Sequence, residues 1–397
     1  MDRVEEQYEV YPYPERDPAD EKKRLITGSP SHPLEIDHML FGGRRDWSQP
    51  LRALVAGGGT GDGLIQLAQV LASAGKPYAI TYLDMSKAAR AVAEARAQVR
   101  GLSGITFVTG SLLDAAEHGP FDYIDCCGVL HHLPEPEAGF RALRGALAPK
   151  GGMGFMVYAP YGRSGVYPLQ EAFGTLLDGL APKDRLQKAK AIVAALPDGH
   201  PFKGNPNLVD HRASDAGFYD LLLHARDRAY DVTTLDAVMR ATGWRLLSFA
   251  TPALYDLARI TDVPPGLDPV ARMAVAEKLR GTIKTHVAYA VPEGDDRTPA
   301  GGAGGALVPH LRGVQAGPLA KAVAQGRPLP IRLGEARADL TLPRGAAKAI
   351  AAIDGRRSIA DLRALSGLDP IRFGADWGRV ERDLADWGLM IYSGLRR

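Results

Sequence analysis

Short apolar runs alternate with amphipathic stretches between residues 51 and 158. The apolar runs are predicted to be strands, near residues 52–56, 78–83, 105–109, 121–127 and 152–158. The amphipathic stretches have helical spacing and are predicted to be helices, near residues 61–74, 87–99 and 137–148. This alternation predicts an α/β fold with a doubly wound parallel sheet, in which the crossovers are right-handed and ligands bind at the carboxyl ends of the strands.

Two further strands are predicted at residues 243–249 and 285–291. Helical, charged stretches at about 165–228 and 252–283 do not fit the strand–helix alternation, so we interpret them as insertions. The sheet domain is therefore predicted to cover residues 51–292. The first insertion is interpreted as a cap over the site or as a homodimer contact.

The last part of the chain is predicted to be a separate module. Residues 293–306 are rich in glycine, proline and acidic residues, a composition that predicts a flexible linker. Within residues 307–397, helices near 359–365 and 372–386 are followed by an apolar run at 388–392. Several helices before a strand suggest a small winged-helix-like domain, which would recruit a partner.

Residues 1–50 are predicted to be a lid or strap. Pro12 and Pro14 hold Tyr11 and Tyr13 in extended conformations, and the sequence around Tyr8 is therefore not expected to form a core helix. One interpretation is that this strap packs its tyrosines on the domain surface. The other is that it closes over a pocket at the carboxyl edge of the sheet.

A glycine-rich turn follows the first predicted strand. Glycines at such a turn tolerate positive φ and let a ligand approach the backbone, and the next helix begins with unpaired N–H groups. Asp84 ends the second strand, about 20 residues after the turn, where an acid that binds both ribose hydroxyls of a nucleotide-like cofactor belongs. The alternatives are a mobile loop for the glycines and a helix cap for Asp84, although Ser86 can provide that cap.

At this point the sequence resembles the class I S-adenosylmethionine-dependent methyltransferases. The motifs that carry the resemblance stand in the family's order, at Val55–Gly61, Tyr82–Ser86, Phe107–Leu112, Phe121–Leu133 and Leu147–Gly152. The resemblance implies a Rossmann-like seven-stranded sheet with an antiparallel closing edge. It also implies S-adenosylmethionine as cofactor and S-adenosylhomocysteine as product. NAD-linked dehydrogenases share only the first two motifs and remain a minor alternative.

The candidate site residues follow from these motifs and from the loop after the fifth strand. The cofactor candidates are Gly57, Gly58, Gly59, Gly61, Asp84, Met85, Ser111, Leu112, Cys127, Gly128 and His131. The substrate candidates are Tyr11, Tyr13, Tyr158, Arg163 and Tyr167. His132 and Tyr161 are the candidates for catalysis.

The chain departs from the family pattern at two positions. Many members carry an acid at the position of Val55, two residues before the first glycine, and another at the position of Ser111, which contacts the adenine. The cofactor's amino group and adenine must therefore find other partners, for which Asp62, Ser111, Asp114 and the backbone are candidates.

The N-terminal segment carries a second resemblance. Its motifs are Tyr8–Pro14, Arg16–Pro18 and Gly28–Pro33. Together they look like a bacterial group that includes the rickettsial outer-membrane-protein lysine methyltransferases. This resemblance implies a protein or peptide as substrate and lysine as the residue that is methylated.

Composition narrows the function classes. The 397 residues carry a formal net charge of +2, so the composition does not indicate a dominant phosphate-binding surface and does not favour nucleic acid as a partner. Cys126 and Cys127 are adjacent in a predicted strand, so a disulfide is not expected, and no apolar stretch reaches membrane-spanning length. We expect a cytoplasmic protein without membrane insertion. No metal is expected, because His131 and His132 have no third ligand at a recognisable spacing.

Methyl transfer from a sulfonium needs alignment and desolvation more than a protein nucleophile. A lysine acceptor must arrive neutral, which a tyrosine-lined pocket would favour, whereas a hydroxyl or an acid would need a base such as His132. Three hypotheses remain open, namely a protein lysine methyltransferase, a small-molecule methyltransferase and a non-catalytic cofactor-binding scaffold. An open groove towards residues 307–397 would favour peptide, and an enclosed cavity would favour a metabolite. Cofactor binding separates the two enzymes from the scaffold.

Overall fold

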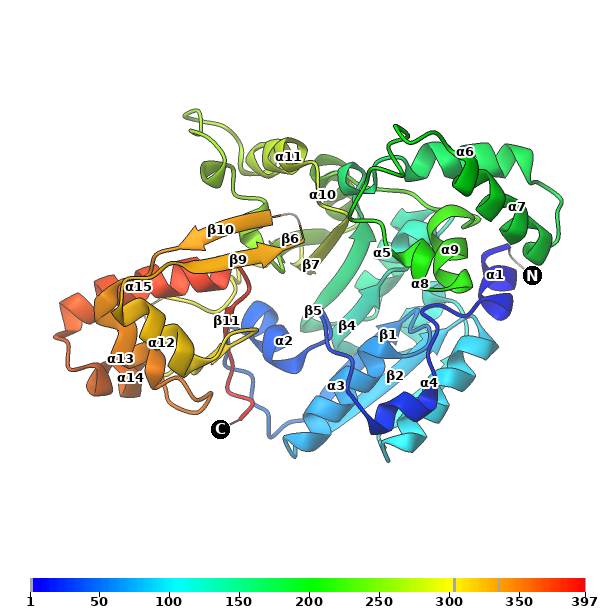
Figure 1. Cartoon of the computed structure of the whole chain (residues 1–397). Helices are drawn as coiled ribbons and strands as arrows, with labels where there is room; N and C mark the ends of the chain where they lie inside the picture. Colours follow the sequence, from blue (N-terminus) through cyan, green and yellow to red (C-terminus); the bar gives the residue numbers. More distant parts are fainter. Residues whose placement is uncertain (1–2, 303–304, 335, 397) are drawn as a thin grey trace.

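The structure is a computed structural model that describes residues 3–302, 305–334 and 336–396. A central sheet with helices on both faces forms the middle of the molecule (Figure 1). The helical insertion and the N-terminal helix lie at one end, and a small C-terminal module lies at the other. None of the helices within these ranges combines the length and apolar character needed to cross a bilayer.

The central sheet has seven strands in the order β3-β2-β1-β4-β5-β7-β6. Their bounds are Leu51–Ala56 for β1, Tyr78–Asp84 for β2, Ile105–Thr109 for β3, Phe121–Cys127 for β4, Leu147–Tyr158 for β5, Trp244–Phe249 for β6 and Thr285–Pro292 for β7. Strand β7 runs antiparallel to β5 and β6, whereas the pairs among β1 to β5 are parallel. The predicted Rossmann-like sheet with an antiparallel closing edge is confirmed.

Helices cover both faces of this sheet. One face is covered by α2 (Pro33–Leu40), α3 (Asp62–Ser73) and α4 (Lys87–Val99). The opposite face is covered by α5 (Pro136–Gly145), α10 (Val232–Ala241) and α11 (Pro269–Arg280). Because both faces are buried, β1 is apolar almost throughout rather than alternating, as is typical of a parallel strand.

The first insertion has an apolar core of its own. Its helices are α6 (Val166–Leu176), α7 (Pro182–Ala195), α8 (Asp210–Ala213) and α9 (Asp215–Leu222). Phe173, Leu186 and Phe218 are buried between them. Tyr11 of the N-terminal segment packs against this core, so the insertion and the strap meet above the carboxyl edge of the sheet (Figure 1).

The C-terminal module packs around a core of its own. Its helices are α12 (Ala316–Ala324), α13 (Ala347–Ala351), α14 (Ile359–Ser366) and α15 (Pro370–Asp386), and its strands are β8 (Pro309–Leu311), β9 (Leu329–Leu333), β10 (Ala336–Leu340) and β11 (Met390–Tyr392). The predicted helices near 359–365 and 372–386 and the final strand are present, and Ser358 and Asp361 form a capping box. The β9–β10 hairpin and α12 were not predicted, and the winged-helix arrangement stays a prediction.

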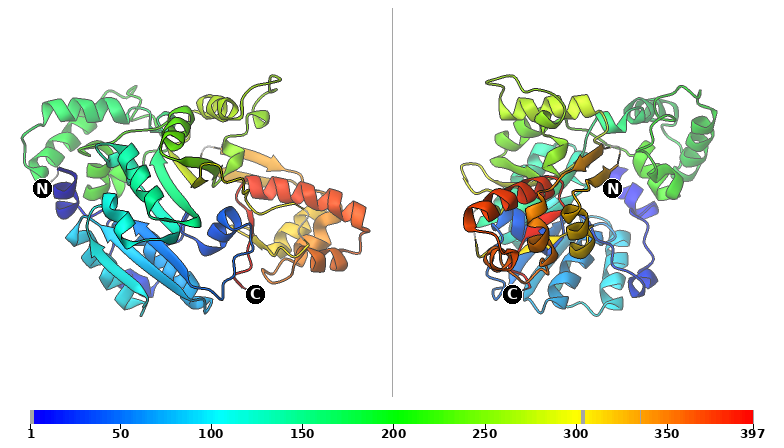
Figure 2. Two further views of the ribbon diagram at one scale, coloured as in Figure 1. Left: turned by 180° about the vertical axis from the view of Figure 1, so that it is seen from behind. Right: turned by 60° about the vertical axis from the view of Figure 1, so that its left-hand side comes forward.

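The module is docked on helix α2 through a buried carboxylate. Asp37 accepts hydrogen bonds from Trp47 Nε1 at 3.0 Å, from Ser393 Oγ at 2.7 Å and from Gly394 N at 3.0 Å. These three donors bond Oδ2 and Arg45 N donates to Oδ1 at 3.0 Å, so both oxygens of this fully buried carboxylate are satisfied. Figure 2 shows the end of the chain running beside α2 from two further directions.

Two local expectations differ from the structure. Residues Arg3–Val10 form helix α1, because Pro12 and Pro14 restrict only the residues that precede them and leave the chain before Tyr11 free to be helical. The segment is therefore helical up to Val10, where a strap was expected, but it is not a core helix, since Val10 is exposed. Residues 293–302 were expected to be a flexible linker, yet Arg297 Nη1 donates to the carbonyl oxygen of Lys150 at 2.9 Å, and Ala300 N donates to the carbonyl oxygen of His38 at 2.7 Å.

Candidate active site

A cavity of about 410 Å³ lies at the carboxyl ends of β1, β2 and β4. In the strand order, β1 and β4 are neighbours where the direction of winding reverses, which is the place where doubly wound sheets bind ligands. Four parts of the chain line the cavity, namely the N-terminal segment, the glycine turn, the strand ends and the first insertion. None of its lining residues comes from the described parts of the C-terminal module.

The glycine turn needs its glycines for conformation and for space. Gly57 and Gly59 have φ of +66° and +51°, in the region that favours glycine. A Cβ on Gly57 would clash with Val129, and one on Gly58 would clash with the ring of Tyr82. Gly57, Gly58 and Gly59 line the cavity with bare backbone, whereas Gly61 packs against Ala93 and does not.

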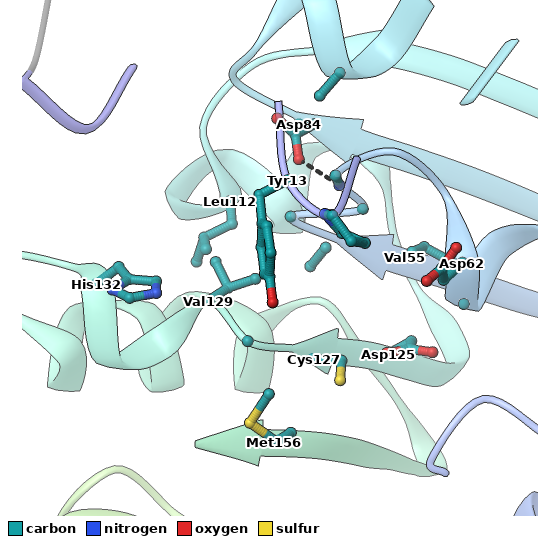
Figure 3. A pocket seen from close by; sticks show the side chains of 18 of the residues that line it. Tyr13, Val55, Asp62, Asp84, Leu112, Asp125, Cys127, Val129, His132 and Met156 are labelled. Carbon is teal, nitrogen blue, oxygen red and sulfur yellow. Dashed lines mark hydrogen bonds between the residues drawn. The ribbon is translucent and has the colours of Figure 1, made fainter. Parts of the chain in front are cut away.

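Asp84 lies at the edge of the cavity beside this turn (Figure 3). Its Oδ2 accepts a hydrogen bond from Gly59 N at 2.7 Å and its Oδ1 accepts one from Ser86 N at 2.8 Å. Burial raises the pKa of this carboxyl group. Ser86 caps α4 by accepting from Ala89 N, so Asp84 is not needed as the cap and its remaining acceptor positions are available to a ligand.

The remaining strand ends add a largely apolar surface. Met85, Ser111 and Leu112 line one side of the cavity, and Cys127 and Gly128 line the other. Ser111 Oγ accepts a hydrogen bond from Leu113 N at 3.1 Å. These side chains are suited to hold a flat aromatic ligand rather than a charged one, because they offer contact area and no ionised group.

The N-terminal strap enters the cavity. Figure 3 shows the ring of Tyr13 between the glycine turn and the ends of β4 and β5. The strap is held there because Thr60 Oγ donates to the carbonyl oxygen of Pro14 at 2.6 Å and Arg16 pairs with Asp62 at 2.6 Å. Tyr13 is therefore placed as the lid interpretation expects. Tyr11 instead stacks on Tyr219 of the insertion, with ring centroids 5.0 Å apart, and does not line the cavity.

A buried carboxylate marks the other end of the cavity. Asp220 of α9 is 4% exposed and lines the cavity. Its Oδ1 accepts from Tyr8 OH and its Oδ2 accepts from Tyr158 OH, both at 3.2 Å. Burial raises the pKa of Asp220. No lysine or arginine in the described residues forms a salt bridge with it, so the tyrosine hydroxyls only partly compensate its charge.

His132 lies next to this carboxylate and has a defined tautomer. Its Nδ1 is 2.6 Å from the carbonyl oxygen of Arg226. Because a carbonyl only accepts, Nδ1 must carry the proton, which leaves Nε2 able to accept one. The ring of His132 stacks on that of His224, with centroids 3.6 Å apart. His132 lines the cavity.

The predicted residues of the loop after β5 support the cavity from behind. The guanidinium of Arg163 lies 3.6 Å from the ring centroid of Tyr158 and pairs with Asp227 at 2.6 Å. Arg163 also donates from Nε to Tyr167 OH at 2.9 Å. Tyr158 lines the cavity, but Arg163, Tyr167 and Tyr161 do not. None of these three side chains therefore lies at the cavity, and Arg163 and Tyr167 belong to the packing beneath Tyr158.

Comparisons with known proteins agree with this geometry. A protein-family model described as a methyltransferase domain matches residues 54–153. An uncharacterized protein of Synechococcus sp. is 35% identical over 208 residues, which cover 50% of this chain and 48% of that protein. This chain therefore matches about half the length of that curated relative.

Solved structures share the fold over most of the chain. PKMT2 from Rickettsia typhi has a TM-score of 0.65 at 14% identity, with 94% of this chain and 77% of that chain covered. The same protein in complex with AdoHcy has a TM-score of 0.63 at 15% identity, with 91% and 75% covered. Residues 54–153 therefore match a methyltransferase domain.

Two groups of side chains in the methyltransferase domain have the composition of metal ligands. They are His131 with His132 and Asp227, and His132 with Asp220 and His224, each with ligand atoms within 4.8 Å of one another. In the second group the two rings are stacked at 16°, so one ion cannot lie in the plane of both rings. In the first group Arg163 is already bound to Asp227 and repels a second cation. Neither group is assigned as a metal site.

Sequence reasoning missed three residues of the methyltransferase cavity. Tyr8 was quoted only as part of a motif, and Asp220 was given no role at the site. Asp125 was quoted within β4 without a role, although an acid between Ile124 and Cys126 in a buried strand was a usable signal. His131 was predicted to touch the cofactor, but it is fully buried against Tyr158 and does not line the cavity.

The ionisation of Asp125 predicts a pH dependence of stability. Burial raises its pKa from 3.8 to about 6, although a hydrogen bond from Ser31 Oγ acts in the opposite direction. Between pH 3.8 and about pH 6, Asp125 keeps its proton in the folded state and has lost it in the unfolded state. The free energy of unfolding therefore falls as the pH rises through this range. A shift of about two pKa units corresponds to about 3 kcal/mol.

Urea unfolding of the ligand-free protein and of Asp125→Asn at pH 4.5 and 7.5 measures this effect. The wild type is expected to lose about 2 kcal/mol more than the variant between these two pH values, since part of the full effect lies below pH 4.5. Asp215→Asn is the control, because Asp215 lies on the exposed side of α9 and pairs with Lys190. Equal pH dependence in wild type and Asp125→Asn would contradict the prediction.

Proposed function

We propose that this protein is an S-adenosylmethionine-dependent methyltransferase whose acceptor is an amine, and that the amine is a lysine side chain of a protein. One observation carries the choice of acceptor, namely the buried Asp220 carboxylate in the tyrosine-lined end of the cavity. An anion in that position attracts an ammonium group and disfavours an acidic acceptor. The N-terminal resemblance to rickettsial lysine methyltransferases and the shared fold of PKMT2 support the protein substrate.

The cofactor end of the cavity fits S-adenosylmethionine. The glycine turn offers bare backbone, Asp84 offers carboxylate oxygens to a ribose, and Leu112 and Val129 offer apolar contact to an adenine. When bound, the sulfonium supplies an activated methyl carbon to an aligned nucleophile. The acidic side chain that contacts the adenine in many members of the family is absent here, because Ser111 occupies its position.

The acceptor end of the cavity accounts for binding and for deprotonation. Asp220 holds the incoming ammonium group, and the rings of Tyr8, Tyr13 and Tyr158 remove water from around it. A protonated amine has no lone pair and must lose a proton before it can react. His132 Nε2 accepts that proton, while Nδ1–H stays bonded to the carbonyl oxygen of Arg226.

A small amine is the second candidate acceptor. The cavity of about 410 Å³ receives no side chain from the described C-terminal module, so the groove towards residues 307–397 that would favour a peptide is not part of it. The nature of the substrate therefore needs a direct test. Radiolabelled methyl transfer onto fractionated lysate separates a protein product from a small-molecule product, and amino-acid analysis of the product identifies methyllysine.

The Asp220→Asn variant tests the choice of acceptor. It is expected to lower kcat/KM for the amine about 10- to 100-fold while leaving the affinity for S-adenosylhomocysteine unchanged, because it removes charge only at the acceptor end. Asp215→Asn on the same helix is the control, since its side chain is exposed. Unchanged methylation by Asp220→Asn, or methyl groups found on oxygen, would overturn the amine assignment. Failure of the wild type to bind S-adenosylhomocysteine would overturn the enzyme assignment.

A further inference from the structure

The acid that the family carries before the glycine turn is absent from this chain, and the neighbouring strand places another acid at the same level. Val55 occupies the family position on β1. In the parallel register of β1 and β4, the partner of Val55 is Asp125. Paired residues of adjacent parallel strands point to the same face of the sheet, and both side chains line the cavity. This chain therefore carries a carboxylate on β4 instead of on β1, at the same level of the cavity.

Asp125 is buried without a positive partner. Its side chain is 2% exposed, and Ser31 Oγ of the N-terminal segment donates to its Oδ2. Within the described residues, no arginine or lysine forms an ion pair with it. A buried carboxylate with one hydroxyl donor is poorly compensated, so its charge is best satisfied by a cationic group of a ligand that enters the cavity.

The other candidates for this role are already occupied or lie elsewhere. Asp62 pairs with Arg16 at 2.6 Å and with Arg96 at 2.8 Å, so its charge is balanced within the protein. Asp114 is exposed and does not line the cavity. Asp220 and His132 lie at the opposite end of the cavity from Asp125, as Figure 3 shows for His132. The two buried acids therefore serve two different ligands.

We propose that Asp125 binds the α-ammonium group of the cofactor's methionine portion, in place of the missing acid at position 55. This inference rests on the proposed function, since it assigns one part of the same cofactor site. It accounts for a buried acid in the middle of an otherwise apolar strand, and for the Ser31 hydroxyl that orients it. It also defines the orientation of the bound cofactor. The methionine portion of the cofactor lies at Asp125, and the amine that accepts the methyl group lies at Asp220.

The test compares two ligands by calorimetry. One is S-adenosylhomocysteine, and the other is its deamino analogue, in which hydrogen replaces the α-amino group. We expect the wild type to bind S-adenosylhomocysteine about 10- to 100-fold more tightly than the analogue. In Asp125→Asn this preference should fall below about threefold, with the affinity for the analogue almost unchanged. Binding of the analogue shows that the variant is folded.

A compensating pair of substitutions provides the rescue. Asp125→Val alone should lose the preference, and the double variant Val55→Asp with Asp125→Val should regain at least part of it. Both exchanges are close in volume, because valine and aspartate have similar shapes. If Asp125→Asn keeps the full preference, or loses affinity for both ligands equally, the inference is wrong while the cofactor site stands. If the wild type binds neither ligand, the proposed function itself fails.

Discussion

The Asp84→Ala variant is expected to lose about 100- to 1,000-fold in affinity for S-adenosylhomocysteine. The carboxylate of Asp84 lies at the edge of the cavity and is already oriented by Gly59 N and Ser86 N. Hydrogen bonds to a charged group contribute about 1.5–3 kcal/mol each, and a ribose offers two hydroxyl donors. Losing both hydrogen bonds corresponds to about two to four orders of magnitude in affinity. We expect a loss below the upper end, because the substitution also removes the unfavourable burial of the Asp84 charge.

Isothermal calorimetry of wild type and variant measures this loss, with Ser86→Ala as the matched control. Ser86 caps α4 next to Asp84, so its substitution perturbs the same segment and leaves the ribose acceptor in place. We expect Ser86→Ala to cost about 1 kcal/mol of stability and to change affinity less than fivefold. Equal affinity in wild type and Asp84→Ala would show that the cofactor binds elsewhere.

The Arg96→Ala variant is expected to lose about 3 kcal/mol of folding free energy. Arg96 is 1% exposed and connects α4 to the N-terminal segment and the glycine turn. It pairs with Glu21 at 2.6 Å and with Asp62 at 2.8 Å, and it donates to the carbonyl oxygen of Thr60 at 2.7 Å. Removing one partner of a buried ion pair costs about 3–5 kcal/mol. We expect the lower end, because Arg100 still pairs with Glu21.

Denaturant unfolding measures this cost, and Arg90→Ala is the control on the same helix. Arg90 is about one third exposed and pairs with Glu94 one turn away, an arrangement that contributes at most about 0.5 kcal/mol. Because Arg96 also holds the carbonyl of Thr60, the affinity for S-adenosylhomocysteine should fall with stability in Arg96→Ala and not in Arg90→Ala. Similar stability in both variants would mean that the network around Glu21 does not hold the strap.

The amino-acid sequence by itself determined the sheet and the cofactor end of the site. Apolar strands, the glycine turn and Asp84 are signals that lie within about 30 residues of one another, and their spacing follows from the geometry of one βαβ unit. The same holds for Ser86 as a helix cap, because a cap needs only the first turn of its own helix. The strands were therefore predicted close to their observed bounds.

Only the tertiary structure decided what faces the cavity from distant parts of the chain. Tyr8 and Asp220 are separated by 212 positions, and Ser31 and Asp125 by 94, so no local pattern could pair them. The register of β1 against β4 places Asp125 beside Val55, and the packing of the loop after β5 turns Tyr161 and Arg163 away. Local propensity encodes which elements form, whereas the packing of those elements against one another decides which side chains meet.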